Sequence, residues 1–252
     1  PAPSITATVP PTTVPPTTAT PDTTATTTTS STAAPTTGPR IEFRQAAEDT
    51  DEYSYTISYP LLVDAAGVPV AGANVAIEDW VADSIAQLQT AATTLEAKAI
   101  MNAQVAPELL NESVWSVSGV STRFVDSAAG SVSRRHGWIV DLASGVVVTA
   151  QDLLLDGDLT PLAEAARLHL VADVLGSEDA LAGPDGLLPV AANFDAAWLT
   201  TTGIGVGFDE GQVAAPDAGS PAILIPFAEL DVFLLKDGVL APLAEGDTLP
   251  EP

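Results

Sequence analysis

The chain has 252 residues and a formal net charge of −25, from 33 acidic residues against eight lysines and arginines. Such a charge repels the phosphates of nucleic acid and the headgroups of anionic lipids, so nucleic acid is excluded as a partner. The chain contains no cysteine, which excludes a disulfide framework and thiolate chemistry. The longest apolar stretches, Trp138 to Ala150 and Ala222 to Leu235, are interrupted by Asp, Gly or Pro and fall short of the ~20 residues that span a bilayer.

Residues 1–39 consist almost entirely of threonine, proline, alanine and serine, and Asp22 is their only charged residue. With so few large apolar side chains this segment cannot offset the entropy of ordering, so we expect a disordered stalk over 1–39. Fully extended at ~3.1 Å per residue, the stalk would reach on the order of 100 Å and hold a domain clear of a thick envelope. Because the sequence begins at Pro1 without a methionine, we expect a removed upstream segment that carries any anchor, either a lipid or a transmembrane helix.

After the stalk the composition changes, and we predict a folded domain over 40–240 followed by an acidic tail over 241–252. Aromatic and β-branched side chains alternate from Tyr53 to Tyr59, which predicts a strand that Pro60 ends. Residues 74–99 predict an amphipathic helix with Asn74 as N-cap and Lys98 near its negative end. Its apolar stripe comprises Ile77, Trp80, Val81, Ile85, Leu88, Ala92 and Leu95.

The middle of the chain predicts an antiparallel meander and a second helix. The strands are Ser113 to Val125, Ser131 to Leu142 and the β-branched run from Val146 to Thr149. The helix begins with Thr160 as cap and Pro161 at its first position, and the residues on its buried side are Leu162, Ala166, Leu170 and Val174.

Three further strands, at Asn193 to Leu199, Gly203 to Asp209 and Ala222 to Pro226, precede a short helix from Phe227 to Leu235 that turns Leu230, Phe233 and Leu234 inward. The predicted fold class is therefore α+β, with antiparallel sheet, two main helices and a short C-terminal helix behind the stalk.

One basic island interrupts the acidic sequence: Arg134, Arg135, His136 and Trp138 lie together, and the two arginines form the chain's only adjacent basic pair. Such an island can hold an acidic group, while Trp138 can stack on a sugar or a peptide ring. The alternative is ordinary pairing of the arginines with neighbouring carboxylates. These four residues are the predicted binding site.

The sequence predicts no catalytic residue, metal or cofactor. His169 lies four residues before Asp173, as expected for a surface pair on one helix face. The acidic runs from Glu48 to Glu52 and from Asp152 to Asp158 could approach a hard cation, but neither has the spacing of an EF-hand. We interpret Asp141, Gly145 and Asp152 as turn residues.

Several segments together resemble the family of the extracellular domain of the anti-sigma factor RsiV, a domain also found beside the catalytic domain of the peptidoglycan deacetylase PdaC and, more distantly, in secreted bacterial antigens. The segments are Tyr55 to Pro60, Asp141 to Gly145 leading to Asp152-Leu153-Leu154, Asn193-Phe194, Gly203 to Phe208, and Ala222 to Pro226. The resemblance covers 53–235 and implies an α+β fold. It also implies a non-enzymatic binding role, because in RsiV this domain captures lysozyme, a basic enzyme whose charge would suit this acidic chain.

The resulting hypothesis is a secreted or cell-surface domain, tethered through its missing N-terminus, that binds a basic extracellular protein such as lysozyme or a cell-wall component. An alternative is a surface antigen or adhesive lipoprotein without a specific ligand. A third is an enzyme that acts on wall polymers through acidic residues.

Overall fold

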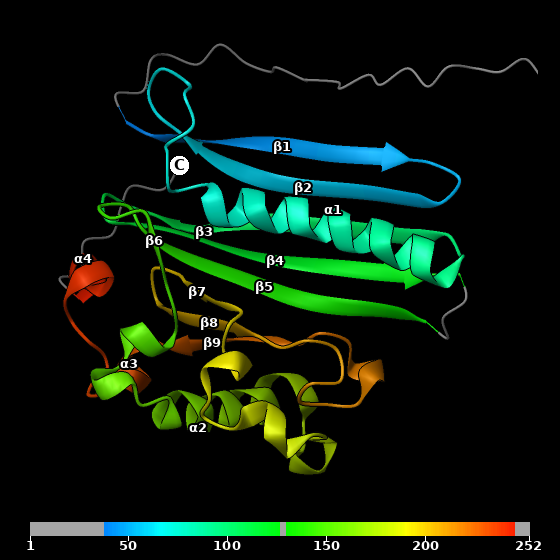
Figure 1. The fold of residues 1–252 in the computed structure, drawn as a ribbon. Helices are drawn as coiled ribbons and strands as arrows, with labels where there is room; N and C mark the ends of the chain where they lie inside the picture. Colours follow the sequence, from blue (N-terminus) through cyan, green and yellow to red (C-terminus); the bar gives the residue numbers. More distant parts are fainter. Residues whose placement is uncertain (1–37, 127–129, 245–252) are drawn as a thin grey trace, which may run out of the picture. The chain divides into compact units, whose positions relative to one another are not determined.

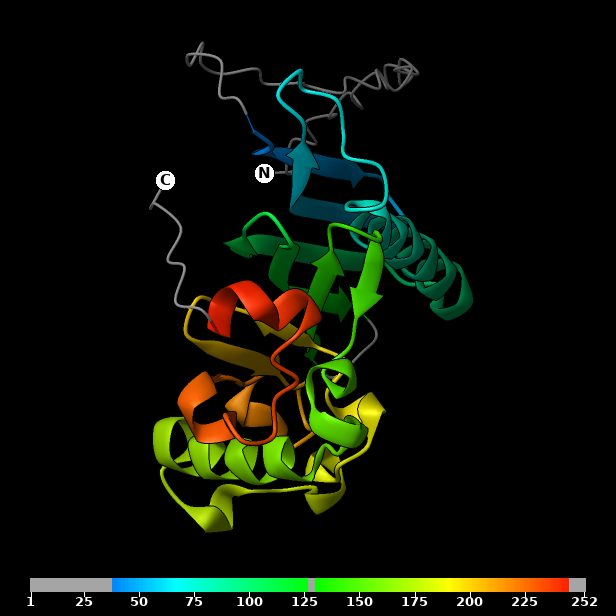
Figure 2. The same ribbon diagram turned by 90° about the vertical axis from the view of Figure 1, so that its left-hand side faces the viewer.

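A computed structural model describes residues 38–126 and 130–244. The predicted stalk therefore lies outside the described residues except for Gly38 and Pro39, and residues 245–252 of the predicted tail also lie outside them. The described chain contains two sheets, mostly antiparallel, and few helices, so the predicted α+β class is confirmed. The layers are one helix, the larger sheet, the smaller sheet and a second helix, as Figure 1 and the turned view in Figure 2 show.

The larger sheet has six strands arranged in chain order: β1 (Arg40–Asp49), β2 (Tyr53–Val63), β3 (Ala99–Leu110), β4 (Val114–Val125), β5 (Ser131–Asp141) and β6 (Val146–Val148). Neighbouring strands are antiparallel except β2 and β3, which run parallel because helix α1 (Val75–Leu95) carries the chain back across the sheet. The sequence prediction contained no β1 or β3. In β3 the buried alternation runs through Ala99, Met101, Ala103 and Val105, and three of these four are alanine or methionine, which carry a weak strand signal.

The prediction that Pro60 ends its strand is wrong, because β2 continues to Val63 and Pro60 pairs with Phe43 of β1. Pairing between β2 and β3 stops at Ser58, so at Pro60 the strand has a neighbour on one side only. Proline lacks a backbone N–H. It is accepted at this position because one edge of β2 has no neighbouring strand to which an N–H would donate.

Helix α1 begins after Asn74 and packs on β2 and β3, with Ile77, Val81, Leu88 and Ala92 buried, as its apolar stripe predicts. Leu95 was wrongly included in the stripe, because as the last residue of the helix it is 51% exposed. Asn74 is the N-cap residue, but its side chain makes no capping bond; its amide instead bonds the backbone N–H and C=O of Leu62, both at 2.8 Å. The helix ends at Leu95, so Lys98 is too late to stabilise its negative end. The Lys98 ammonium instead lies 2.9 Å from a carboxylate oxygen of Asp49.

The smaller sheet contains β7 (Ala197–Leu199), β8 (Gly203–Gly207) and β9 (Ala222–Pro226), all antiparallel. Its outer face is covered by α2 (Thr160–His169), which continues as a π-helix η3 (Leu170–Leu175). Two short helices follow, α3 (Phe227–Leu230) and α4 (Ala241–Ala244). The 3-10 helices are η1 (Gln151–Leu153), η2 (Leu155–Gly157), η4 (Glu178–Ala180), η5 (Pro184–Leu187), η6 (Ala191–Asn193), η7 (Pro216–Ala218) and η8 (Gly238–Leu240).

Several predicted boundaries in this half are wrong. The N-cap of α2 is Leu159 rather than Thr160, whose N–H donates to the Asp158 carboxylate at 2.9 Å. Val174 is 44% exposed because the change to π-helical geometry at Leu170 rotates the later residues out of the α-helical stripe.

Helix α3 ends at Leu230 rather than at the predicted Leu235, and the chain then runs beside Leu153 and Leu155, so Phe233 is 42% exposed whereas Leu234 is buried. The strand predicted from Asn193 begins only at Ala197, because Asn193 belongs to η6. Helix α4 lies beyond the predicted domain boundary at residue 240, and its Leu243 packs against the core.

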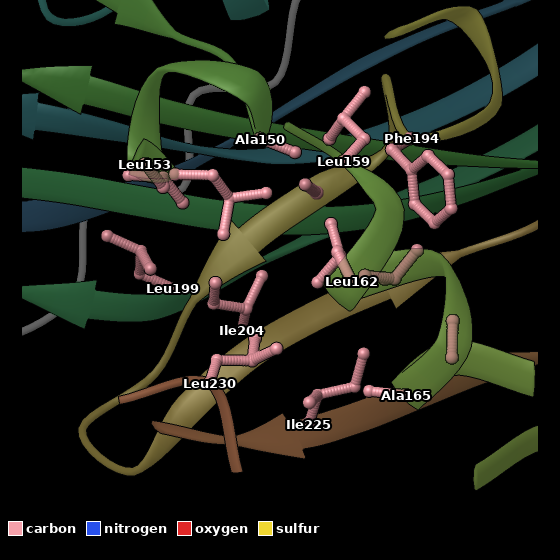
Figure 3. Packing of buried hydrophobic residues seen from close by; sticks show 14 of the residues in the cluster. Ala150, Leu153, Leu159, Leu162, Ala165, Phe194, Leu199, Ile204, Ile225 and Leu230 are labelled. Carbon is pink, nitrogen blue, oxygen red and sulfur yellow. The ribbon is translucent and has the colours of Figure 1, made fainter. Parts of the chain in front are cut away.

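The largest core cluster lies between α2 and the smaller sheet and reaches the larger sheet through Leu109, Val114 and Ile139. Figure 3 shows Leu162 of α2 near Ile204 and Ile225 of the small sheet. The two sheets are also joined by a buried hydroxyl, since Ser116 of β4 accepts the N–H of Leu199 at 2.7 Å and donates to the carbonyl of Trp138 at 3.2 Å. No helix among the described residues is long and apolar enough to cross a membrane.

Candidate functional site

The four predicted site residues all lie on β5, but the strand divides them between its two faces. Side chains alternate along a strand, so Arg134, His136 and Trp138 share the face on which α1 packs, while Arg135 points toward the smaller sheet. The structure therefore brings three of the four residues together. Figure 1 shows β5 between β4 and the strands of the small sheet.

His136 is enclosed by two tryptophans and a serine. Its ring centroid lies 4.7 Å from that of Trp80 on α1 and 5.9 Å from that of Trp138, with which it stacks. The two indoles meet edge to face at 5.4 Å. The Nε2 atom of His136 is hydrogen-bonded to the hydroxyl of Ser121, 2.9 Å away on β4. These contacts fix the imidazole between the helix and the sheet.

The surroundings of His136 disfavour its charged form. Burial lowers its pKa from 6.5 to about 4, and the positive charge of Arg134 acts in the same direction. His136 is therefore neutral at physiological pH. Trp138 is half-buried against the core cluster that contains Trp115 and Val140, so it supports the histidine from behind.

Arg135 joins the two sheets. Its backbone N–H donates to the Asp209 carboxylate at 2.9 Å, and its Nε donates to the carbonyl of Ser220 at 2.8 Å. The guanidinium stem lies against Gly207, where an added Cβ would come within 2.6 Å of the Arg135 side chain. Burial lowers the pKa of this guanidinium. Arg135 thus acts in the packing between the sheets.

The outer edge of β5 is covered by the loop after β8. The N–H of Ser133 donates to the Glu210 carboxylate at 2.8 Å, and the N–H of Glu210 donates to the Ser133 carbonyl at 3.0 Å. Carboxylates that accept from an edge strand prevent another strand from pairing there. The same loop places Asp209 3.8 Å from the Nε of Arg134, an exposed and long ion pair.

A groove of about 400 Å³ lies between α1 and the strands β3, β4 and β5. We call it the α1–sheet groove. Its helix wall is formed by Ala76, Asp79, Trp80, Asp83, Ser84 and Gln87, and its sheet wall by Met101, Ser121, Arg123, Val132, Arg134 and His136. The helical residues recur at intervals of three and four and so lie on one stripe.

The groove carries both signs of charge. Within the described ranges 38–126 and 130–244, Arg123 has no carboxylate within 4.0 Å, and neither Asp79 nor Asp83 has a basic nitrogen within that distance. The charged side chains of the two walls therefore do not neutralise one another by direct contact. They remain available to a ligand between them.

Sequence reasoning missed the contributions of α1, β3 and β4 to this groove. In the sequence, the helical period of α1 places Asp79, Trp80 and Asp83 along one side of its apolar face. The pairing of these residues with Ser121 and Arg123 of β4, which lie on the same face of the sheet as Arg134 of β5, depends on the order of strands and could not be read locally.

The acidic turn residues have local partners. Asp141 accepts from the Ala143 N–H at 2.9 Å and the Ser144 hydroxyl at 2.7 Å, and Asp152 accepts from the N–H and hydroxyl of Thr149 at 2.9 and 2.7 Å. These hydrogen bonds lower the pKa of both carboxyls. Among the described residues, no group of three or more His, Asp or Glu side chains is placed to hold a metal ion.

The predicted pair of His169 and Asp173 is confirmed, with 2.8 Å between Nδ1 and the carboxylate. The structure adds Glu229 of α3, whose carboxylate lies 3.1 Å from Nε2. Hydrogen bonds from both acids raise the pKa of His169, with Asp173 the larger cause. This cluster holds α3 against the end of α2.

Solved structures share this fold. A DUF3298 family protein from Bacteroides fragilis aligns with a TM-score of 0.58 at 12% identity, over 83% of this chain and 99% of its own. A DUF3298 family protein from Pseudomonas aeruginosa aligns with a TM-score of 0.51 at 14% identity, over 78% of this chain and 95% of its own. At these identities the likeness concerns the fold. No family model matches the sequence, and no curated protein matches it.

Proposed function

We propose that this chain is a non-enzymatic binding domain that acts outside the cell, tethered to the cell envelope, and that its ligand occupies the α1–sheet groove. The observation that supports this proposal is the groove itself. It is a concave site of about 400 Å³ with an indole, a neutral imidazole and charged groups of both signs in its walls. Ligand sites of proteins combine an apolar lining with a few placed polar groups in this way, within a range of about 300–1,000 Å³.

The chemistry of the groove favours binding over catalysis. Ser121 and His136 are within hydrogen-bonding distance, as a nucleophile and its base are in hydrolases. A base works best when its pKa is near the operating pH, whereas that of His136 is lowered to about 4. In the described part of the chain no carboxylate lies within 4.0 Å of His136 to orient it, as the salt bridges show.

The sequence supports a place outside the cell. A Thr/Pro-rich segment precedes the domain, and its composition is typical of spacers that carry a domain away from a surface. The resemblance of segments such as Tyr55 to Pro60 and Gly203 to Phe208 to the RsiV-type extracellular domains also supports this proposal.

A basic protein of the lysozyme type is a second candidate partner, favoured by the net charge of −25. Long-range attraction would speed its association and fade as salt is added. Acidic surfaces also collect basic proteins without specificity, so a specific complex must be saturable and survive at about 150 mM salt.

The test fills the groove with one side chain. Ser84→Trp places an indole in the helix wall, and Ala82→Trp places the same indole on an exposed position of α1 outside the groove. Titration calorimetry measures binding of the full chain and both variants to hen lysozyme and to a soluble peptidoglycan digest, with cytochrome c as a basic control protein.

We expect saturable binding of one of the two probes by the unmodified chain and by Ala82→Trp, and at least a tenfold loss in Ser84→Trp, equivalent to about 1.4 kcal/mol. Equal binding by both variants would refute the groove as the site. Absence of binding to either probe would favour a surface antigen or adhesive protein without a specific ligand.

A further inference from the structure

The charges that line the α1–sheet groove are balanced, although the chain as a whole is strongly acidic. Arg123 and Arg134 lie on the sheet wall, and Asp79 and Asp83 lie on the helix wall. Two cations against two anions leave the lining formally neutral, in a chain whose net charge is −25. Because like charges are segregated to opposite walls, the groove has a positive side and a negative side.

The groups between the charged rims are mostly apolar or uncharged. Trp80 and Met101 provide apolar surface, and Ser121 and the neutral imidazole of His136 provide hydrogen-bonding atoms. A ligand that bridges the walls would therefore place charge at its two ends and an uncharged portion against the indole. The imidazole adds no positive charge that would upset the balance.

The charge pattern selects among ligand classes. An anion with several charges, such as a phosphate ester, would meet Arg123 and Arg134 but also the two aspartates and the field of an acidic chain. A simple cation would satisfy the aspartates and be repelled by the arginines. A molecule with one carboxylate and one ammonium at opposite ends satisfies both walls at once.

We infer that the α1–sheet groove binds a short peptide-like zwitterion, with its carboxylate between Arg123 and Arg134 and its ammonium facing Asp79 and Asp83. The inference rests on the proposed function and names the chemical class of its ligand. Guanidinium groups bind carboxylates through paired, charge-assisted hydrogen bonds. The volume of about 400 Å³ suits a molecule of a few residues.

Arg134 already makes one ion-pair contact, with Asp209. Its Nε lies 3.8 Å from a carboxylate oxygen of Asp209, and its side chain is 56% exposed. Such a long exposed pair contributes little, about 0–1 kcal/mol. A ligand carboxylate at the terminal nitrogens can therefore form without first breaking a strong contact, while Asp209 stays bonded to the N–H of Arg135.

The test is a titration of the full, nitrogen-15-labelled chain with trialanine, followed by NMR. The chain has four tryptophans, so its indole N–H signals report on separate regions. Trp80 lines the groove, whereas Trp115 and Trp198 are buried elsewhere and serve as internal controls. We expect a saturable shift of the Trp80 signal with a Kd on the order of 1 mM, and little change at the two controls.

Blocked peptides separate the two walls. N-acetyl-trialanine lacks the ammonium, trialanine amide lacks the carboxylate, and the doubly blocked peptide lacks both. We expect each single block to weaken binding at least fivefold and the double block to abolish the shift. Arg134→Gln should remove the preference for a free carboxylate but keep that for a free ammonium, and Asp83→Asn should do the reverse.

Matched variants outside the groove control for net charge. Arg44→Gln on β1 and Glu164→Gln on α2 change the chain's charge by the same amounts at exposed positions. They should leave the affinity for trialanine within about twofold of the unmodified chain, about 0.4 kcal/mol. If they weaken binding as much as the groove variants do, general electrostatics explains the effect and the inference is refuted.

The outcomes also separate this inference from the proposed function. Equal binding of free and blocked peptides, or no shift of Trp80 by trialanine, overturns the zwitterion. If Ser84→Trp nevertheless abolishes binding of lysozyme or of the peptidoglycan digest, the groove remains the binding site and only the ligand class is wrong. If Ser84→Trp alters neither experiment, both proposals fail together.

Discussion

The pH dependence of stability should carry a distinct contribution from His136. Its pKa is 6.5 in an ordinary environment and about 4 in the folded protein, mainly because burial penalises the charged imidazolium. As the pH falls through 6.5 the unfolded chain takes up a proton at this position, whereas the folded chain does so only near pH 4. Between these values the unfolded state binds more protons, so acidification destabilises the fold.

The size of the effect follows from the two pKa values. Lowering the pH from about 7.5 to about 5 should reduce the free energy of unfolding by about 2 kcal/mol through His136 alone. His169 acts in the opposite direction. Its pKa is raised by Asp173 and Glu229, so it stabilises the fold at low pH and this contribution is lost as pH rises through the folded pKa.

The assay compares the chain with His136→Gln, because glutamine does not titrate and can still bond the Ser121 hydroxyl. Urea unfolding at the two pH values gives the pH-dependent loss for each protein, and the contributions of His169 and the carboxyls cancel in the difference. The variant should lose about 2 kcal/mol less than the parent on acidification. Equal losses, or an NMR titration of His136 near or above its ordinary pKa, would show that the imidazole is not enclosed as the structure has it.

Three further changes test the architecture. Gly145→Val should destabilise the fold by ~1 kcal/mol or more, because Gly145 has a φ of +72° and an added Cβ would lie 3.3 Å from the Cα of Gly72. A loss below about 0.5 kcal/mol in urea unfolding would contradict this prediction. Ser116→Ala should cost about 1–3 kcal/mol, because it leaves the buried N–H of Leu199 unpaired, and exposed Ser131→Ala is the matched control that should cost almost nothing. Removal of residues 1–37, which lie outside the described residues, should shift the melting temperature by no more than about 2 °C, because their composition offers few apolar side chains to bury. Calorimetry measures this shift, and a larger loss would show that these residues pack on the domain.

Local patterns predicted those elements whose own sequence repeats with a clear period. The apolar stripe of α1 and the hairpin of β4 and β5 were predicted close to their observed bounds. Strand β3 was missed because most of its buried positions hold alanine or methionine, and Val105 is the one β-branched residue among them. The position of β3 between β2 and β4 depends on how all the strands of the sheet pack together, and its own sequence determines this position only in part.

The candidate site shows the same division. The sequence by itself determined the acidic charge, the basic island at Arg134 to Trp138 and the helix that carries Trp80, because composition and periodicity are local properties. Only the tertiary structure decided that Arg135 packs between the sheets, that His136 is half-buried and neutral, and that the aspartates of α1 face arginines of β4 and β5. The physical reason is that a strand's alternation says which residues share a face, but the neighbours of that face are chosen by the packing of segments far apart in the chain.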